Sequence, residues 1–241
     1  MGFFAIRFME YVEIFREVDR KKIILAAKAS LRQPEGKEAL NYLKNKRQFS
    51  DEVIDRFDFG YCPLNINHQL RGRIITPIYD HHNSLIAIST RYIDKKRQNR
   101  FWHESFDKSY YIYGLNIAKS SIMKHNKAVL VEGEFDVALL HSKGLSLAVG
   151  VCGSSFTLFQ ASLLSRYCSD VFVVFDGDES GKKSIKRTMD LYKKYNLIAY
   201  KINYIPVFLP QNEDPDEYVR RQGMKKFKEL LKKSREESKM I

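Results

Sequence analysis

The sequence predicts an α/β protein, α+β overall, in which a mostly parallel sheet flanked by helices follows a smaller, mixed basic subdomain. Three observations lead to this fold class. Apolar runs typical of strands alternate with helical stretches from residue 128 onward, as in βαβ units. Upstream, two runs within residues 73–93 have the strand-like pattern of a β-hairpin, on either side of a polar turn. Finally, three acidic clusters lie at or near the ends of the later apolar runs.

The first half of the chain is divided by short breaks. Residues 1–31 carry charged side chains at helical spacing among apolar ones, which indicates one or two amphipathic helices and no membrane span. Residues 36–58 predict two short helices, the second capped by Ser50. Strand-like runs at 73–79 and 84–93 flank the polar residues 80–83 and predict a β-hairpin.

The second half repeats a strand followed by a helix. We expect strands at 128–131, 146–151, 171–175 and 198–204, with a helix after each and Gly223 interrupting the last one. In such sheets, ligands bind beyond the carboxyl ends of the strands, where Glu132 and Asp176 fall. The predicted organisation is therefore a helical segment at 1–35, a basic subdomain at 36–115, the parallel-sheet domain at 116–231 and a charged tail at 232–241.

Charge and cysteine content limit the classes of function. The 241 residues include 41 Lys and Arg against 29 Asp and Glu, a formal net charge of +12. This excess indicates a polyanionic partner, although an AT-rich genome whose proteins favour lysine would also produce it. Basic and aromatic residues interleave at 95–108, as suits a nucleic-acid strand or an ordinary solvated loop. Three cysteines without a CxxC pair support neither a zinc ribbon nor disulfides and fit a reducing cytoplasm.

The acidic clusters carry the chemistry. They are residues 132–136, 176–178 and 213–217. Asp176 and Asp178 can converge only if the chain turns between them, and Gly177 permits that turn. Carboxylates collected in one site repel each other, so some would hold protons near neutral pH unless a cation neutralised them. Mg²⁺ prefers oxygen ligands of this kind, and two such ions support phosphoryl transfer. Each cluster alone is as well explained by a capped turn or an acidic helix start.

The stretches 131–136, 175–181 and 213–219 lie in the order of the three TOPRIM motifs, and residues 128–231 closely resemble a TOPRIM domain. That module is shared by DnaG-type primases, topoisomerases and some nucleases. The stretches 49–63, 70–78, 108–115 and Gly153-Ser154-Ser155 resemble the DnaG-type primase in particular. The resemblance covers roughly residues 36–231.

The resemblance implies a set of site residues. Glu132, Asp176 and Asp178 would be the catalytic, metal-binding acids, with Glu132 also handling a proton. The supporting metal-site acids would be Asp136, Asp214 and Asp216. The basic residues expected to touch template or nucleotide phosphates are Arg71, Arg73, Arg91, Arg100 and Lys108. Arg100 stands where the family has Lys, and Ser89 and Thr90 replace the family's glycines before Arg91.

The resemblance also implies an activity. It is that of a primase catalytic core, which synthesises short RNA primers on single-stranded DNA from ribonucleoside triphosphates by nucleotidyl transfer with Mg²⁺ or Mn²⁺. Because the chain has no ligand set for a zinc module, we expect no zinc in it. A replicative helicase and a separate zinc-bearing subunit are the expected partners, in a bacterial cytoplasm, with a phage or mobile element as a source. No membrane is expected as a partner.

Two rival functions remain open from the residues. A TOPRIM nuclease would cut DNA with the same metal site, although the primase-like upstream stretches argue against it. A non-catalytic single-strand-binding or replisome component would retain the fold without the chemistry, and the intact acids at every cluster argue against that.

Overall fold

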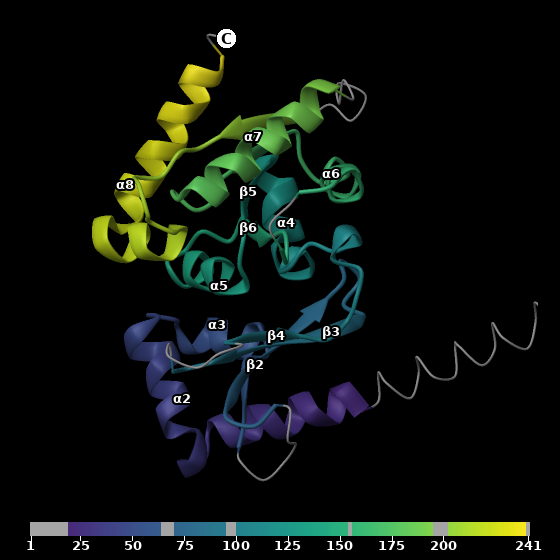
Figure 1. The fold of residues 1–241 in the computed structure, drawn as a ribbon, viewed down its shortest axis with the longest axis vertical. Helices are drawn as coiled ribbons and strands as arrows, with labels where there is room; N and C mark the ends of the chain where they lie inside the picture. The colour runs from purple at the N-terminus through teal and green to yellow at the C-terminus, as the bar shows by residue number, and fades with distance from the viewer. Residues whose placement is uncertain (1–18, 64–69, 95–99, 154–155, 195–201, 240–241) are drawn as a thin grey trace, which may run out of the picture. The chain divides into compact units, whose positions relative to one another are not determined.

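The computed structural model describes residues 19–63, 70–94, 100–153, 156–194 and 202–239. The chain divides into two compact units. Unit 1 holds residues 1–46, 50–79 and 83–106, and unit 2 holds residues 47–49, 80–82 and 107–241. Figure 1 labels their elements. The predicted helices before residue 19, the basic stretch 95–99, Ser154-Ser155 and most of the predicted strand 198–204 lie outside the described residues.

Unit 1 is an antiparallel sheet with helices. The sheet has the order β1-β2-β3-β4, and β2 and β3 form the predicted hairpin, with Thr76 opposite Ser89. Ser50 caps the predicted second short helix by accepting a hydrogen bond from the Val53 N–H over 3.2 Å. The elements are a helix over residues 19–31, η1 (Pro34–Gly36), α2 (Lys37–Asn41), η2 (Tyr42–Lys46), α3 (Asp51–Arg56), β1 (Gly60–Cys62), β2 (Arg73–Tyr79), β3 (Leu85–Tyr92) and β4 (Phe101–His103).

The core of unit 1 lies between the helix over residues 19–31 and one face of this sheet. Ile24 and Ala27 of the helix belong to the same buried cluster as Ile75 of β2 and Ile88 of β3. Their spacing of three residues on the helix and the alternation along the strands place these side chains on facing surfaces. Burial of this apolar surface is what holds helix and sheet together.

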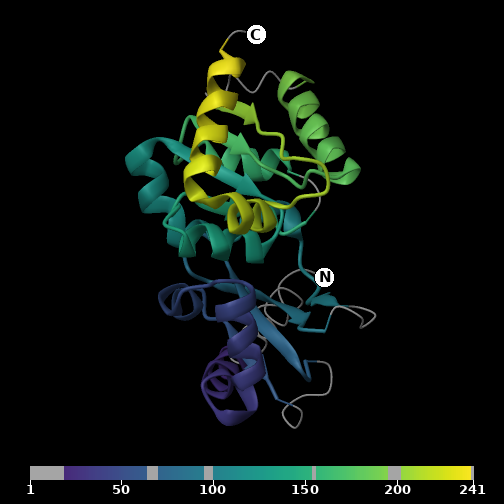
Figure 2. The ribbon, with the colours of Figure 1, turned by 90° about the vertical axis from the view of Figure 1, so that its left-hand side faces the viewer.

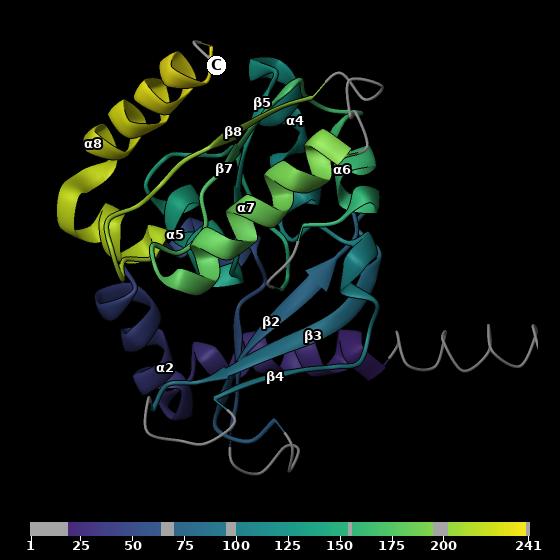
Figure 3. The same cartoon turned by 45° about the horizontal axis from the view of Figure 1, so that its top comes forward.

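Unit 2 is a parallel sheet in the order β6-β5-β7-β8, which confirms the predicted fold class. Its strands are continuous apolar runs because helices cover both faces. In Figures 2 and 3, α7 and α8 lie on opposite faces of the sheet. The elements are η3 (Lys108–Tyr110), α4 (Leu115–His125), β5 (Lys127–Val131), α5 (Glu134–Ser142), β6 (Ala148–Gly150), α6 (Leu158–Leu164), β7 (Asp170–Val173), α7 (Glu179–Lys194), β8 (Asn203–Pro206) and α8 (Pro215–Ser238).

The order of the strands creates a switch point. From β5 the chain crosses through α5 to β6 on one side, and from β7 it crosses through α7 to β8 on the other side. β5 and β7 are therefore neighbours whose following connections run in opposite directions. In open α/β sheets, ligands bind beyond the carboxyl ends of the strands at such a point. As predicted, α8 is interrupted at Gly223, where φ is 83°. No helix in the described part of the chain is both long and apolar enough to cross a bilayer.

Candidate active site

Two acidic side chains leave the ends of neighbouring strands at the switch point. Glu132 follows β5, and Asp176 follows β7 after Val174, whose N–H still donates to the carbonyl of Leu130. The backbone N–H of Asp176 donates to Glu132 Oε1 over 3.3 Å. The structure thus brings these two predicted acids together at the carboxyl edge of the parallel sheet.

The chain turns sharply at Gly177, between Asp176 and Asp178. A Cβ atom on Gly177 would lie 2.0 Å from the carbonyl oxygen of Pro210, so only glycine permits this approach. The Gly177 N–H donates to the carbonyl of Glu213 over 2.8 Å. The exposed Asp178 accepts from the Gly181 N–H over 2.7 Å, at the start of α7. Backbone contacts therefore fix the second acidic cluster beside the third.

We call Glu132, Asp176 and Asp178 the strand-end acids. Burial, and after it repulsion from Glu132, Asp214 and Asp178, together raise the pKa of Asp176 to about 7. Burial also raises the pKa of Glu132. The Oδ1 atom of Asp176 is buried and has no hydrogen-bond partner among the described residues. Within the described residues no cation of the protein neutralises this group through an ion pair.

We call Asp136, Asp214 and Asp216 the helix-start acids because each lies in the first turn or at the cap of a helix. Asp136, which is buried, accepts from the Gly133 N–H over 3.2 Å at the start of α5. Asp214 caps α8 by accepting from the Glu217 N–H over 2.6 Å. Carboxylates at these places satisfy free N–H groups and face the positive end of the helix.

Asp216 is held by two arginines. Its side chain is fully buried, with Arg47 Nη2 2.6 Å from Oδ2 and Arg220 Nε paired with Oδ1. The guanidinium of Arg47 also lies over the ring of Phe135, with 5.2 Å from its central carbon to the ring centroid. Burial raises the pKa of Asp216 and the two arginines oppose that shift. Asp216 is thus already compensated by protein charges.

Asp136 links the two groups of acids. Its pKa lies well above the ordinary value, first because of burial and then because of repulsion from Asp214, Asp176 and Asp216. All six predicted acids therefore lie in one electrostatic neighbourhood. The strand-end acids form no ion pair there with any described residue, although Asp178 accepts a helix N–H at the start of α7. Asp136 and Asp214 also accept backbone N–H groups, and Asp216 is paired with two arginines.

The strand-end acids fit a divalent cation in charge and donor type. A buried carboxylate oxygen without a partner and a pKa near neutrality are the features that a bound cation would relieve. Within the described residues, no three His, Cys, Asp or Glu side chains are already placed to hold a metal ion.

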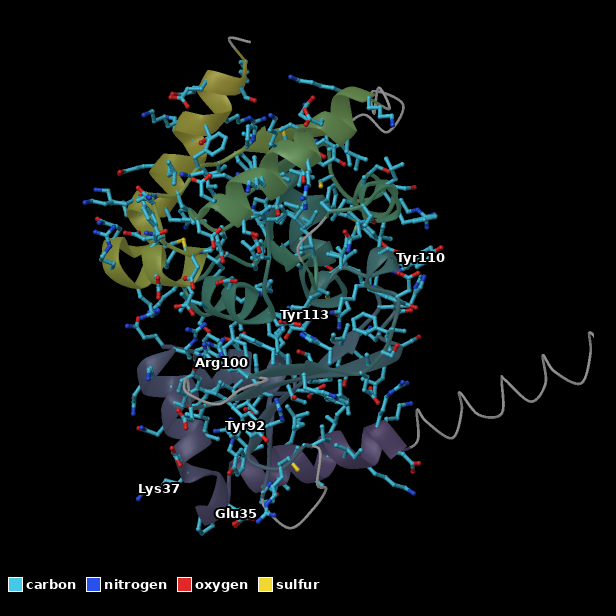
Figure 4. All side chains as sticks on the ribbon, viewed as in Figure 1. Glu35, Lys37, Tyr92, Arg100, Tyr110 and Tyr113 are labelled. Atoms are coloured by element: carbon cyan, nitrogen blue, oxygen red, sulfur yellow. The ribbon has the colours of Figure 1, made fainter. Side chains whose placement is uncertain are left out.

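The predicted basic residues of unit 1 are not equivalent. Arg91 and Arg100 both flank Phe101, with guanidinium carbons 5.0 Å and 5.4 Å from the ring centroid. Phe101 itself is 50% exposed, so its ring is accessible to a ligand. Guanidinium groups beside an accessible aromatic ring suit a single strand, through phosphate contacts and base stacking. Arg100 and Tyr92 are labelled in Figure 4.

Arg73 is turned to the other face of the same sheet. Arg73 pairs with Tyr92 across β2 and β3, whereas Ile74 pairs with Arg91, so alternation separates the two arginines. The guanidinium of Arg73 lies 3.7 Å from the centroid of Tyr92 and donates to the carbonyl of Arg100 over 3.3 Å. These contacts brace neighbouring strands. Burial does not distinguish the two arginines, since Arg73 is 6% exposed and Arg91 is 7% exposed.

The other two basic residues lie in different surroundings. Arg71 is exposed just before β2 in unit 1. Lys108 begins η3 in unit 2, where its carbonyl accepts from Gln160 Nε2 over 3.0 Å. Gln160 is completely buried and also donates to the carbonyl of Tyr111 over 2.7 Å. The backbone that carries Lys108 is therefore firmly anchored to α6.

Sequence reasoning missed Arg47 and Arg220. Arg220 stands four residues after Asp216, a helical spacing that would have suggested the ion pair. Arg47 carries no such signal, since it lies far from every acidic cluster in the sequence. Only the fold places it against Asp216.

The parallel sheet and its acids define a class of domain. Residues 129–219 match the family model described as Toprim-like. They include all six predicted acids, and the chain therefore carries a Toprim-like domain.

The relatives of the whole chain are DNA primases, which confirms the resemblance to DnaG-type primases. The DNA primase of Synechococcus elongatus is 28% identical, with 93% of this chain and 39% of that protein covered. That of Aquifex aeolicus is 28% identical, with 83% and 46% covered. The chain thus spans less than half the length of these curated relatives. Primases with a Toprim-type domain generally depend on a metal ion.

Solved structures agree with these relatives. The catalytic core of the Escherichia coli primase superposes with a TM-score of 0.77 at 27% identity, covering 88% of this chain and 78% of that one. A DnaG primase catalytic domain bound to single-stranded DNA gives a TM-score of 0.78 at 26% identity, with 88% and 76% covered.

Proposed function

We propose that this chain is the catalytic core of a primase, which synthesises short RNA primers on single-stranded DNA from ribonucleoside triphosphates. The carrying observation is the uncompensated charge of the strand-end acids at the switch point of a Toprim-like sheet. Glu132, Asp176 and Asp178 would hold Mg²⁺ or Mn²⁺. When bound, the ion supplies charge neutralisation for the phosphates and lowers the pKa of the attacking hydroxyl.

The protein's own residues position the reactants. The 3′-hydroxyl of one nucleotide attacks the α-phosphate of the next and pyrophosphate leaves, so no protein nucleophile is required. The raised pKa of Glu132 favours a role for it in accepting the proton of that hydroxyl. The helix-start acids support the loops that carry the strand-end acids, and we propose no direct metal contact for Asp216.

We propose that the template contacts Arg91, Arg100 and the exposed Phe101, together with Arg71 and Lys108. Support for Arg73 as a phosphate ligand is weaker because its guanidinium is engaged with Tyr92 and the Arg100 carbonyl. The net charge of +12 supports a polyanionic partner. A replicative helicase and a zinc-bearing subunit remain proposed partners, and the bacterial cytoplasm remains the proposed location.

The test is primer synthesis on a single-stranded template with MgCl₂ or MnCl₂. The double variant Asp176→Ala with Asp178→Ala should lose activity by about 10³-fold or more, because charge stabilisation of the phosphates is removed. A matched control replaces Asp190 and Glu229 by Ala, two exposed helical acids of the same unit.

Unchanged synthesis in the double variant would refute the proposed site. If labelled DNA is cut in the presence of metal without nucleotides, the chain is instead a nuclease. DNA binding that needs no metal, with no synthesis under any condition, identifies a binding module.

A further inference from the structure

A pocket of about 430 Å³ opens in unit 2 beside the last helix. Its apolar lining includes Val129 of β5, Phe172 of β7, Leu147 just before β6 and Leu231 of α8. The first two face the same side of the sheet, as paired residues of parallel strands. The pocket therefore lies between α8 and one face of the sheet, and its volume is large enough for one large apolar side chain or a small ligand.

Basic side chains surround this apolar floor. Lys127, Lys228, Lys232 and Arg235 line the pocket together with His125. The side chains of Lys232 and Arg235 are 80% and 45% exposed. Lys127 and Lys228 form no ion pair with any described residue. Lys232 Nζ lies 3.9 Å from Glu236 Oε1, and Arg235 Nη2 lies 2.6 Å from Asp170 Oδ2. The pocket thus combines an apolar floor with a basic rim whose Lys127 and Lys228 are unpaired among the described residues.

The pocket is separate from the acidic site. Lys127 begins β5, whereas Glu132 follows its last residue. Five residues of extended strand span about 16 Å, so the pocket lies toward the amino ends of strands whose carboxyl ends carry the acids. No residue of the pocket belongs to the proposed catalytic machinery.

The arrangement of charge indicates the kind of occupant. Lys228, Lys232 and Arg235 follow one face of α8 at steps of four and three residues, which distributes their charges over about 10 Å. A single phosphate group is better held by converging donors, and Arg235 is already paired with Asp170 at 2.6 Å. Phe172 is 4% exposed, and the other apolar residues of the floor are 1–8% exposed. The floor is therefore apolar but recessed, and it presents no open ring on which bases could stack.

We propose that this pocket binds a short acidic segment of a partner protein. One large apolar side chain of that segment enters the pocket, and carboxylates on either side of it pair with the lysines of α8. Anchor side chains in a pocket with a charged rim are the usual source of affinity and specificity in such contacts. This interaction does not depend on the catalytic proposal.

The experiment measures fluorescence anisotropy of a labelled peptide in which Asp residues surround one central Phe. The full chain should bind it saturably, and Lys228→Glu with Lys232→Glu should weaken binding by about tenfold or more. The matched control, Lys226→Glu with Lys233→Glu, makes the same charge change on exposed residues of α8 that do not line the pocket. It should change the dissociation constant by less than about threefold.

Two further arms can overturn the proposal. A peptide with Ala in place of the central Phe should bind about tenfold more weakly, and equal binding would show that charge alone is being measured. A single-stranded DNA oligonucleotide or inorganic triphosphate that competes for the pocket in the wild type, but not in the Lys228/Lys232 variant, would assign the pocket to a phosphate ligand. Equal loss in the control variant would also overturn the proposal. Primer synthesis by the Lys228→Glu, Lys232→Glu variant should equal that of the wild type, whether or not the peptide binds.

Discussion

The strand-end acids and the helix-start acids lie in one neighbourhood of unit 2 but are neutralised in different ways. Asp216 is fully buried between Arg47 and Arg220. Asp176 is also largely buried, yet its Oδ1 has no partner among the described residues and its pKa rises to about 7. The surroundings of a carboxylate, and not its motif, therefore distinguish a structural acid from a candidate metal ligand.

Each group contains a pair of aspartates separated by one residue. Asp176 and Asp178 flank a glycine, while Asp214 and Asp216 flank a proline. Proline at the first position of α8 fixes the helix start, which directs Asp214 to cap the helix and Asp216 into the interior. Glycine instead lets the chain turn against Pro210, so that Asp176 and Asp178 stay near the open edge of the sheet.

Removal of Asp216 should have the largest effect on stability. Asp216→Ala leaves the partly buried guanidiniums of Arg47 and Arg220 without their carboxylate and should lower the free energy of unfolding by about 3 kcal/mol. Urea unfolding measures this loss of stability. Asp178→Ala, at an exposed position, is the control and should stay within about 0.5 kcal/mol of wild type. Equal losses in both variants would remove the distinction between the two groups.

Addition of Mg²⁺ should stabilise the protein through the strand-end acids alone. At a concentration a hundredfold above the dissociation constant, the gain is about 2.7 kcal/mol, measured as a rise in Tm against NaCl of equal ionic strength. Asp176→Asn with Asp178→Asn should abolish this rise, and Asp216→Ala should keep it despite a lower starting Tm. A rise that survives in the double variant would place the ion elsewhere.

The pH dependence of the metal-free protein should show the smallest effect. Asp176 titrates at about 7 in the folded chain and near 3.9 when unfolded. Between about pH 4 and pH 7, Asp176 is therefore protonated in the folded state and ionised in the unfolded state. The contribution of Asp176 to stability is lost as the pH rises through this range.

Asp176→Asn carries no charge at any pH and should remove that loss. With EDTA present, we expect the variant to be more stable than wild type at pH 8 and nearly equal to it at pH 4. Because Asp176 is not fully buried, solvent screening reduces the expected difference at pH 8 to about 1–2 kcal/mol. Urea unfolding at both pH values measures it, with Asp190→Asn as the control. A variant less stable than wild type at pH 8 would mean that another cation of the protein already neutralises Asp176.

Much of the fold could be predicted because its signals are local. The hairpin of β2 and β3 follows from alternation, the Ser50 cap from its place before a helix, and the break at Gly223 from the residue itself. The strand–helix repeat also implied that Glu132 and Asp176 would meet, since the carboxyl ends of neighbouring parallel strands lie at one edge. The roles of the individual site residues stay predictions.

Other features could not be predicted because they depend on contacts distant in sequence. The basic motifs grouped Arg73 with Arg91, yet strand register turns them to opposite faces. The pocket beside α8 is lined by residues of α8, β5 and β7, which are far apart in the sequence. No periodicity of a single segment contains that information.

By itself, the sequence determined the order of the strands and helices, the three acidic clusters and the glycine at which the second cluster turns. Hydrophobic periodicity and backbone preference are properties of short segments, so they can be derived without the fold. Only the tertiary structure decided which acids are neutralised by arginine and which remain open to a cation. Electrostatic partners act through space, and Arg47 contacts Asp216 although the two residues are far apart in the sequence.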